Sequence, residues 1–333
     1  MRILIIANSR FKGGTSGGDK IYESFQKYWP ECSFSVWTML DIDYKPFLLC
    51  YIHRIIIACI IAVFERRRYD IVYSASDFIP DSIPALLYKI KHKTKWIAGF
   101  YLKAFRENRL HFFSQKLVIW LIKKYADMVI VTNKTMYDIF PNKKKTWING
   151  GVDLDLAGLS DEPKIYDAVF VGRIHPSKGI DELIATWKLV RENKPDAQLA
   201  IIGDGDLGIF YIKDRLGITG VHYFGYMGDE RYDIYKQSKV VLNPTPEKYD
   251  HFSMSYVEAM ACGCRLVCYN TPVIRSINPP RMDIDVYAIK PQEIDVNQDI
   301  NIDWASQFDY KAQSLRVYED IRKVIYEDID YRQ

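Results

Sequence analysis

Cysteine is scarce in this chain, and its spacing argues against a fold held together by metal or by disulfides. The 333 residues include six cysteines, which show neither zinc-ribbon spacing nor the spacing of a disulfide framework. Cys262, Cys264 and Cys268 fall on an expected helix end and on the apolar strand RLVCY, where small buried side chains are common. The chain also opens on an apolar strand and not on a signal peptide. We therefore expect no metal site and a protein of the reducing cytoplasm.

An excess of charge of one sign is also lacking. The formal net charge of +3 is too small to indicate a nucleic-acid partner. Apolar residues make up 48% of the chain and charged residues 26%, which excludes both a disordered chain and a fully membrane-embedded one. Basic residues nevertheless cluster in the first half, at 66–68, 89–95 and 143–145. This asymmetry indicates an anionic partner for that half.

The pattern of apolar runs predicts two α/β domains. RILIIA at 2–7 is followed by the glycine-rich loop 13–18 and by a helical pattern over 19–28. Further strand patterns at 69–76, 94–101 and 127–133 alternate with helix-like segments, which predicts a parallel sheet with helices on both faces. We expect the first domain to cover residues 1–150.

The same alternation restarts after the turn WINGGVDLD. Strand patterns at 167–173, 198–205, 221–226, 239–245 and 265–270 predict a second parallel sheet. We place this second domain at 151–310. A last amphipathic helix within 311–333 has a pattern that lets it pack on either domain, including a return to the first.

Residues 47–64, FLLCYIHRIIIACIIAVF, form the most apolar stretch, and three structures remain open for it. A helix buried in the first domain is one. A helix lying in a membrane interface, with Arg66–Arg68 at anionic head groups, is the second. A true membrane span is the third, although His53 and Arg54 lie in its middle.

Charged residues in the second domain predict a pocket for a sugar joined to a diphosphate. Arg173 and Lys178 bracket a turn directly after a strand that ends at Gly172, and two cations there suit a diphosphate. Taken alone, they also fit two solvated surface cations. Asp250 and Glu258 stand eight positions apart, with Asp250 in a loop and Glu258 on the helix that follows it. Acidic side chains suit sugar hydroxyls, and the free amides of the helix start suit a phosphate.

A dinucleotide fingerprint is formally present but is a weak match. Gly203, Gly205 and Gly208 follow a strand with the spacing of the pattern G-x-G-x-x-G. Asp204 and Asp206 lie inside the loop that would have to approach a pyrophosphate, and they would repel it. We therefore interpret this segment as a tight turn from strand to helix.

Several segments, taken in order, resemble the signatures of glycosyltransferase family 4 over nearly the whole chain. They are INGGVDLD, VGRIHPSKGIDELI, LAIIGDGD, FGYM and LNPTPEKYDHFSMSYVEAMACGCRLVCYNTP. The resemblance implies the GT-B fold, which is two Rossmann-like doubly wound domains facing a cleft. It also implies an enzyme that transfers a sugar from a nucleotide-activated donor with retention of configuration and without cofactor or metal.

The resemblance also implies roles for individual residues. Arg173 and Lys178, just after Gly172, would bind the donor diphosphate, while Asp250 would bind the transferred sugar and Glu258 the ribose. The remaining donor contacts would come from the backbone of Gly17 and Gly18 in the first domain, of Tyr226 and Met227 near the base, and of His251, Phe252 and Ser253 near the phosphates.

Two positions depart from the family pattern. Asp250 stands where a glutamate is usual and is roughly 1.5 Å shorter in reach, and His251 replaces a glycine. The segment WIAGFYLKAF lacks the histidine that members commonly place near the donor sugar, and Tyr101 is its nearest replacement by position. A tyrosine hydroxyl is a poor proton acceptor at neutral pH, so the resemblance implies that a donor phosphate oxygen takes the acceptor proton.

The acceptor side is predicted from Tyr101 and from a basic and aromatic stretch that includes Lys103 and Arg106 and continues to Tyr125. This stretch is either an acceptor surface or a core-facing stripe with a solvated face. We expect a UDP- or GDP-sugar donor and a saccharide or lipid-linked saccharide acceptor, in polysaccharide or glycolipid synthesis at the inner face of the membrane. A scaffold of the same fold that binds nucleotide sugar or a partner glycosyltransferase without turnover is the alternative, and a polysaccharide-binding protein at the membrane is a third.

Overall fold

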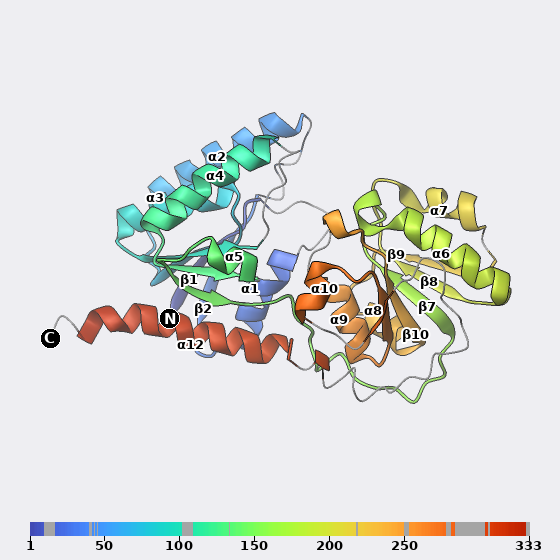
Figure 1. Cartoon of the computed structure of the whole chain (residues 1–333). Coiled ribbons are helices and arrows are strands. Elements are labelled where there is room, and N and C mark those ends of the chain that lie inside the picture. The colour runs from blue at the N-terminus through green and yellow to red at the C-terminus, as the bar shows by residue number, and fades with distance from the viewer. Residues whose placement is uncertain are drawn as a thin grey trace. The chain divides into compact units, whose positions relative to one another are not determined.

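The chain folds into two compact units, each built on a parallel sheet (Figure 1). Unit 1 comprises Met1–Gly150 with Tyr310–Gln333, and unit 2 comprises Gly151–Asp309. The structure is a computed structural model that describes residues 1–9, 17–39, 42, 44, 46–101, 109–132, 134–217, 219–249, 253–277, 281–283, 304–305 and 307–330. The prediction of two parallel-sheet α/β domains is confirmed.

The sheet of unit 1 has the strand order β2-β1-β3-β4-β5-β6, and its described pairs are all parallel. Its strands are β1 (Arg2–Ile6), β2 (Ser33–Trp37), β3 (Ile71–Ser74), β4 (Lys95–Phe100), β5 (Met128–Val131) and β6 (Lys144–Trp147). Its helices are α1 (Gly17–Tyr28), α2 (Phe47–Phe64), α3 (Ile79–His92), α4 (Arg109–Tyr125), α5 (Lys134–Asp138) and α12 (Tyr310–Asp330).

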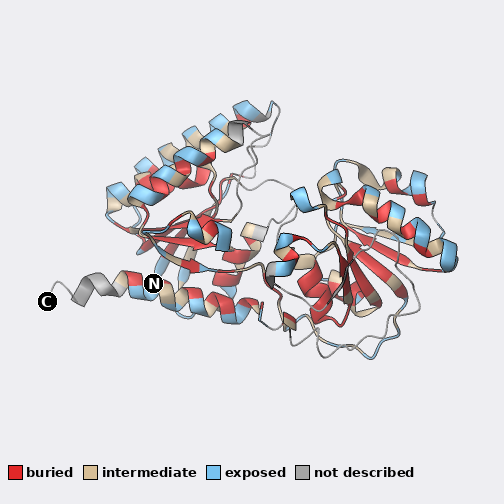
Figure 2. Cartoon of the chain, viewed as in Figure 1, coloured by how far each residue is buried: buried red, intermediate tan, exposed pale blue. Residues whose placement is uncertain are grey.

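Alternation along β1 divides the core of unit 1 between the two faces of the sheet. Leu4 and Ile6 pack with α3 and α4 on one face, whereas Ile3 and Ile5 pack with α1 and α12 on the other. α12 thus covers the same face as α1, although the two are far apart in sequence (Figures 1 and 2). The indole Nε1 of Trp29 donates to the carbonyl of Ser314 at 2.9 Å and anchors α12 there.

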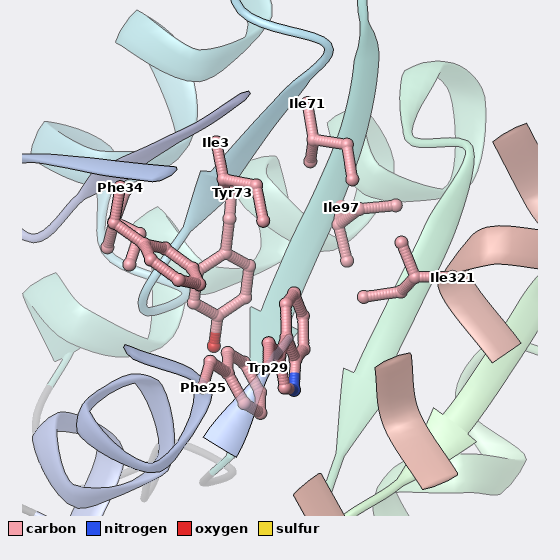
Figure 3. A pocket seen from close by; sticks show the side chains of 9 residues that line it. Ile3, Phe25, Trp29, Phe34, Ile71, Tyr73, Ile97 and Ile321 are labelled. Atoms are coloured by element: carbon pink, nitrogen blue, oxygen red, sulfur yellow. The ribbon is translucent and has the colours of Figure 1, made fainter. Parts of the chain in front are cut away.

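A small void lies in the core beneath α1 and α12 (Figure 3). Its volume is about 10 Å³, and its lining includes Ile3, Phe25, Trp29 and Ile321. An apolar cavity of this size is at the lower limit for one water molecule and offers it few polar partners. It is therefore a packing imperfection and not a ligand site.

The sheet of unit 2 has the order β12-β11-β10-β7-β8-β9 and is parallel at its described pairs. Its strands are β7 (Tyr166–Val171), β8 (Leu199–Ile202), β9 (Val221–Gly225), β10 (Ser238–Asn243), β11 (Arg265–Cys268) and β12 (Arg281–Asp283). Its helices are η1 (Pro176–Lys178), α6 (Ile180–Asn193), α7 (Gly208–Leu216), α8 (Arg231–Lys236), η2 (Glu247–Tyr249), α9 (Met254–Ala261) and α10 (Pro272–Ile277). α6 and α7 pack on one face of the sheet, and α8 and α9 on the other.

α2 settles part of the question left open for residues 47–64. One narrow face of the helix is buried, along Cys50, Arg54, Ala58 and Ala62, while its large aliphatic side chains are mostly exposed (Figure 2). Among the residues that the structure describes, no helix combines the length and apolarity that crossing a membrane would require.

Candidate functional site

The order of strands in unit 2 identifies one edge of its sheet as a binding position. From β7 the chain continues outward through β8 and β9, and it then returns to the other side of β7 with β10 and β11. In open parallel sheets, ligands bind outside the carboxyl ends of the strands at such a reversal. The segments that follow β7 and β10 carry the predicted diphosphate and sugar ligands, so the topology brings these segments to the same edge.

The segment after β7 is a tight turn that exposes its cations. Arg173 is exposed, and it has no side-chain partner within the described part of the chain. Lys178 is half-buried on η1, which His175 caps by accepting a 3.1 Å hydrogen bond from the backbone N–H of Ser177 at its Nδ1. A guanidinium without a protein partner at this edge can bind an anion at little cost in broken contacts.

Gly179 ties the turn after β7 to the loop after β10. Its φ is +72°, and a Cβ at this position would lie 1.9 Å from the carbonyl oxygen of Pro244. Any other residue would force the two segments apart. The glycine in the sequence SKG therefore serves the contact that brings the Lys178 turn against the loop leading toward Asp250.

The glycines of the formal dinucleotide pattern have a packing role. A Cβ on Gly203 would lie 2.0 Å from the carbonyl oxygen of Gly172, and one on Gly205 would lie 2.6 Å from that of Ile174. The loop after β8 thus packs directly on the segment that carries Arg173. These close backbone contacts explain why glycine is needed here. The segment is a tight turn between a strand and a helix, and no bound dinucleotide is required to explain it.

Glu258 is buried in an ion pair that sequence reasoning missed. Nη2 of Arg231 donates to Oε1 of Glu258 at 2.6 Å and Nε donates to Oε2 at 2.9 Å, while the hydroxyl of Tyr235 donates to Oε2 at 3.2 Å. Burial alone lowers the pKa of Arg231, but the hydrogen bonds and charge of Glu258 outweigh burial and raise it. Burial and the charge of Glu258 raise the pKa of Tyr235 well above its ordinary value, so it remains a neutral donor.

Arg231 also connects the base-side loop to α9. Its Nη1 donates to the carbonyl of Gly228 at 2.6 Å, so one side chain joins the loop after β9 to the helix of Glu258. In that loop Tyr226 is 61% exposed and Met227 packs against the core. The only sequence signal for the pair is a lone arginine in the run GDERYDIY, which also fits a solvated surface cation.

Part of the predicted sugar site lies outside the described residues. Asp250, His251 and Phe252 belong to that part, so the structure says nothing of them. Ser253 stands at the N-cap position of α9, with its hydroxyl 2.9 Å from that of Ser255. The described end of this loop therefore begins the helix that carries Glu258.

A pocket that sequence reasoning did not find lies beside these loops. Its volume is about 330 Å³, and it is lined by Glu182 of α6 and by the loops after β10 and β11. Glu247 lines it together with Tyr269, Asn270 and Thr271. Two carboxylates at its wall suit hydroxyl groups and repel phosphate, so this pocket differs in chemistry from the Arg173 turn.

In unit 1, two of the predicted residues are in contact. The ring of Tyr101, which follows β4, comes within 3.1 Å of the position that a Cβ on Gly18 would take, and its hydroxyl is hydrogen-bonded to that of Tyr73. Burial, with a contribution from Asp19, raises the pKa of Tyr101 well above its ordinary value. Gly17 begins α1, whereas Lys103 and Arg106 lie outside the described residues. Tyr101 can donate a hydrogen bond here but cannot serve as a base.

A buried acid at the matching edge of unit 1 was also missed. Asp81 of α3 accepts hydrogen bonds from the hydroxyls of Ser9 and Ser76, which follow β1 and β3, at 2.6 and 2.5 Å. The backbone N–H of Ser9 donates to its other oxygen at 3.0 Å. Burial, only partly offset by these hydrogen bonds, raises the pKa of Asp81 to about 7. Asp81 is completely enclosed, so it fixes the two strand ends and does not face a ligand.

Comparison with known proteins identifies the domain. Residues 166–293 match the sequence family described as glycosyl transferases group 1. The chain carries a group 1 glycosyltransferase domain. This domain contains Arg173, Lys178, Arg231 and Glu258. Membership of family 4 in particular stays a prediction.

The curated relatives described next each match less than half of the chain. An uncharacterized glycosyltransferase of Methanocaldococcus jannaschii, MJ1059, is 31% identical over 181 residues, which are 43% of this chain and 44% of that protein. A phosphatidyl-myo-inositol mannosyltransferase of Propionibacterium freudenreichii is 31% identical over 103 residues, which are 30% of this chain and 25% of that protein. The chain therefore spans less than half the length of either relative.

Solved structures extend the likeness to the fold of the whole chain. Anabaena HepE, crystallised in complex with UDP and glucose, aligns with a TM-score of 0.67 at 16% identity and covers 96% of this chain and 99% of its own. AviGT4, a glycosyltransferase involved in avilamycin A biosynthesis, aligns with a TM-score of 0.64 at 12% identity and covers 98% of both chains. The group 1 glycosyltransferase domain and the preceding unit thus have the GT-B fold.

Proposed function

We propose that this protein transfers a sugar from a nucleoside diphosphate sugar, with UDP or GDP as the nucleotide, to a hydroxyl of a saccharide or lipid-linked saccharide. The observation that carries the proposal is the joint position of Arg173, Lys178 and the start of α9 at the strand reversal of the group 1 domain. The complex of HepE with UDP and glucose supports this choice of donor, because the two proteins share a fold.

Charge neutralisation would supply most of the catalysis. Arg173 and Lys178 would bind the donor diphosphate and stabilise the negative charge that develops as the sugar leaves. Their two positive charges would take the place of a divalent metal. Backbone amides of residues 251–253 would add hydrogen bonds to the phosphates or the sugar, and Asp250 would bind sugar hydroxyls.

Glu258 can still bind a ribose hydroxyl while it is paired. A carboxylate offers about four acceptor positions, and Arg231 and Tyr235 together use three of them. The ion pair would hold the remaining position in a fixed direction. It would also compensate the acid charge, which otherwise would oppose a nearby diphosphate.

We propose that transfer retains the anomeric configuration, with the acceptor attacking from the side of the leaving group. A donor phosphate oxygen would then take the acceptor proton. The raised pKa of Tyr101 favours this route over a tyrosine base, because a phenol that stays protonated accepts no proton. The setting would be polysaccharide or glycolipid synthesis in the cytoplasm, at the inner face of the membrane.

A thermal-shift screen with UDP, GDP, ADP and their sugars tests the proposal first. A ligand that binds only the folded protein raises its melting temperature by mass action, so one nucleotide should stabilise the protein. Release of nucleoside diphosphate from the matching sugar donor should follow, and Lys178→Ala should abolish it. No shift with any nucleotide at millimolar concentration would refute the donor site.

One observation favours a second function, a scaffold that binds nucleotide sugar or a partner glycosyltransferase without turnover. The charge of Glu258 is already compensated by Arg231, as in a purely structural ion pair. The turnover assay separates the two functions. Nucleotide binding by the wild-type protein without turnover of any donor would support the scaffold.

A further inference from the structure

α2 exposes its most apolar face. Seven large apolar side chains exposed on α2 lie four or fewer positions apart along the helix, so they form one continuous stripe. Ile61 and the polar His53 are exposed beside it. Ile56 at its centre is 51% exposed and Phe64 at its end is 75% exposed. We call this set the apolar stripe; it consists of Leu48, Leu49, Ile52, Ile56, Ile60, Val63 and Phe64. Single exposed aliphatic residues are common, but an unbroken stripe of this length marks an interaction surface.

Arg54 prevents the helix from rotating to bury the stripe. It lies on the opposite face, where it is 1% exposed. Its Nε donates to the carbonyl of Ile42 at 2.7 Å, and its Nη1 donates to that of Asn8 at 3.2 Å. Turning α2 would break these hydrogen bonds and leave the carbonyls of Ile42 and Asn8 without their donor, and a buried acceptor that loses its donor costs free energy. The outward direction of the stripe is therefore fixed by the fold.

Cations gather where the stripe ends. Arg66, Arg67 and Arg68 follow Phe64 directly and are all exposed. Nζ of Lys91, on α3, donates to the carbonyls of Val63 and Glu65 at 2.7 and 2.5 Å and adds positive charge at the same place. Of the three arginines, Arg67 alone forms an ion pair within the described part of the chain, and its partner is Glu65. Most of this charge is therefore available to an external anion.

α4 repeats the same combination in the same layer of helices. Phe113, Leu117 and Trp120 are exposed at helical spacing, and Trp120 is 52% exposed. Nζ of Lys124 lies 5.2 Å above the ring of Trp120. α3 contacts both α2 and α4, so the three helices form one layer on the same face of the sheet (Figure 1). Aromatic and lysine side chains in this arrangement are typical of proteins that lie in a lipid interface.

Acidic residues are nearly absent from the layer formed by α2, α3 and α4. This composition favours an anionic membrane over a protein partner. Neither α2 nor α4 contains an aspartate or glutamate, and the one acid of α3, Asp81, is completely buried. Glu65 at the end of α2 is paired with Arg67, and its side chain is 10% exposed. The apolar surface is therefore edged mainly by cations, which complements an anionic lipid bilayer with phosphates above an acyl layer. A protein partner would need an equally one-sided acidic rim.

We propose that the exposed faces of α2 and α4 dock on an anionic bilayer, with the apolar stripe at the acyl boundary and the basic residues at the lipid phosphates. The docking places the proposed transferase where a lipid-linked acceptor would lie. Only this purpose of the docking rests on the proposed function. The test of the docking measures lipid binding alone. Failure to bind lipid and failure to bind nucleotide are therefore distinguishable.

Co-sedimentation of the full chain with vesicles tests the docking. The wild-type protein should sediment with phosphatidylcholine vesicles that contain phosphatidylglycerol, should remain in solution with phosphatidylcholine alone, and should be released by added salt. Ile56→Gln with Ile60→Gln should weaken binding roughly tenfold or more, because half-exposed side chains do not support the fold but would enter the lipid. Arg66→Gln with Arg68→Gln should weaken it roughly fivefold per arginine.

The matched controls lie on α6, where Lys188 and Leu189 are also exposed. Lys188→Gln and Leu189→Gln should leave vesicle binding unchanged. Wild-type protein that stays in solution with anionic vesicles would overturn the proposal, and so would an Ile56→Gln, Ile60→Gln protein that binds as tightly as wild type. Self-association that these substitutions abolish, without any lipid binding, would instead assign the stripe to a second copy of the chain.

Discussion

Arg231 holds both carboxylate oxygens of Glu258, at 2.6 and 2.9 Å, and so fastens the loop after β9 to α9. Both side chains are largely buried. The residue proposed to bind ribose and the loop proposed to lie near the base are therefore positioned by one ion pair. Disturbing this pair should affect stability first and nucleotide binding with it.

Removing one partner of this pair should be costly. Arg231→Ala leaves the Glu258 carboxylate buried without its counter-charge, and we expect a loss of about 3–5 kcal/mol in the free energy of unfolding. Replacing both, Arg231→Met with Glu258→Leu, should be less destabilising than Arg231→Ala alone because no buried charge remains. Urea unfolding followed by circular dichroism measures both. Equal stability of Arg231→Ala and wild type would show that the pair is not formed.

Asp81 should make the folded protein less stable as the pH rises. Most acids in folded proteins have a lowered pKa and act in the opposite direction. Its pKa of about 7 in the folded protein lies above the ordinary value of 3.8, so the folded state holds the proton more tightly than the unfolded chain. The resulting stability is fully present below the unfolded pKa and is lost as the pH rises through the folded pKa. Between the two values the loss is on the order of 1.4 kcal/mol per pH unit.

The measurement is urea unfolding of wild type and Asp81→Asn at about pH 5 and about pH 8. The asparagine variant lowers stability at both pH values, since it cannot accept all the hydrogen bonds from Ser9 and Ser76. Its stability should nevertheless fall less between the two pH values than that of wild type. The same fall in both proteins would contradict the raised pKa.

Gly179 offers a test of the contact between the two phosphate-side loops. Gly179→Ala adds a Cβ that would lie 1.9 Å from the carbonyl oxygen of Pro244, whereas a Cβ on Gly217 meets no atom within 4 Å. Both glycines have φ near +70°, but ψ is 37° at Gly179 and −173° at Gly217, so an alanine at Gly217 carries at least as much backbone strain. Because only Gly179→Ala adds a clash, it should still be the less stable variant, and it should weaken nucleotide binding.

Comparable melting temperatures for the two glycine variants would contradict this account of the contact. Nucleotide affinity, measured on whichever variant folds, separates an effect on the loops from general destabilisation. Gly217→Ala should bind nucleotide like wild type.

Most strands and their parallel pairing were predicted from sequence, because buried apolar runs such as MVIV and LAII are typical of parallel strands. The edge strands β2, β6 and β12 were not predicted, because segments such as SFSVW and KKTW contain no such run. The packing of α12 was not predictable, since its amphipathic face fits either unit and the bond from Trp29 to Ser314 is a long-range choice. Residues 47–64 showed why hydropathy alone is ambiguous. A single buried arginine, Arg54, fixes which side of an apolar helix faces outward.

The candidate site was predicted unevenly for similar reasons. The cations Arg173 and Lys178 follow a strand and a turn, so local pattern locates them. Arg231 has no local signal of its function, because its importance comes from pairing with a residue 27 positions away. Asp81 was missed because one carboxylate at a helix start usually interacts with the helix itself, whereas this one joins two distant strand ends.

Calorimetric titration of UDP and GDP into wild type, Lys178→Ala and Lys188→Ala tests the central claim most directly. Lys188 is an exposed lysine on α6 and serves as the matched control. One nucleotide should bind wild type and Lys188→Ala equally, and Lys178→Ala should bind it roughly ten- to a hundredfold more weakly, the loss expected for a charge-assisted contact. Equal affinity of all three proteins, or no binding by any, would contradict a diphosphate site at the turn after β7.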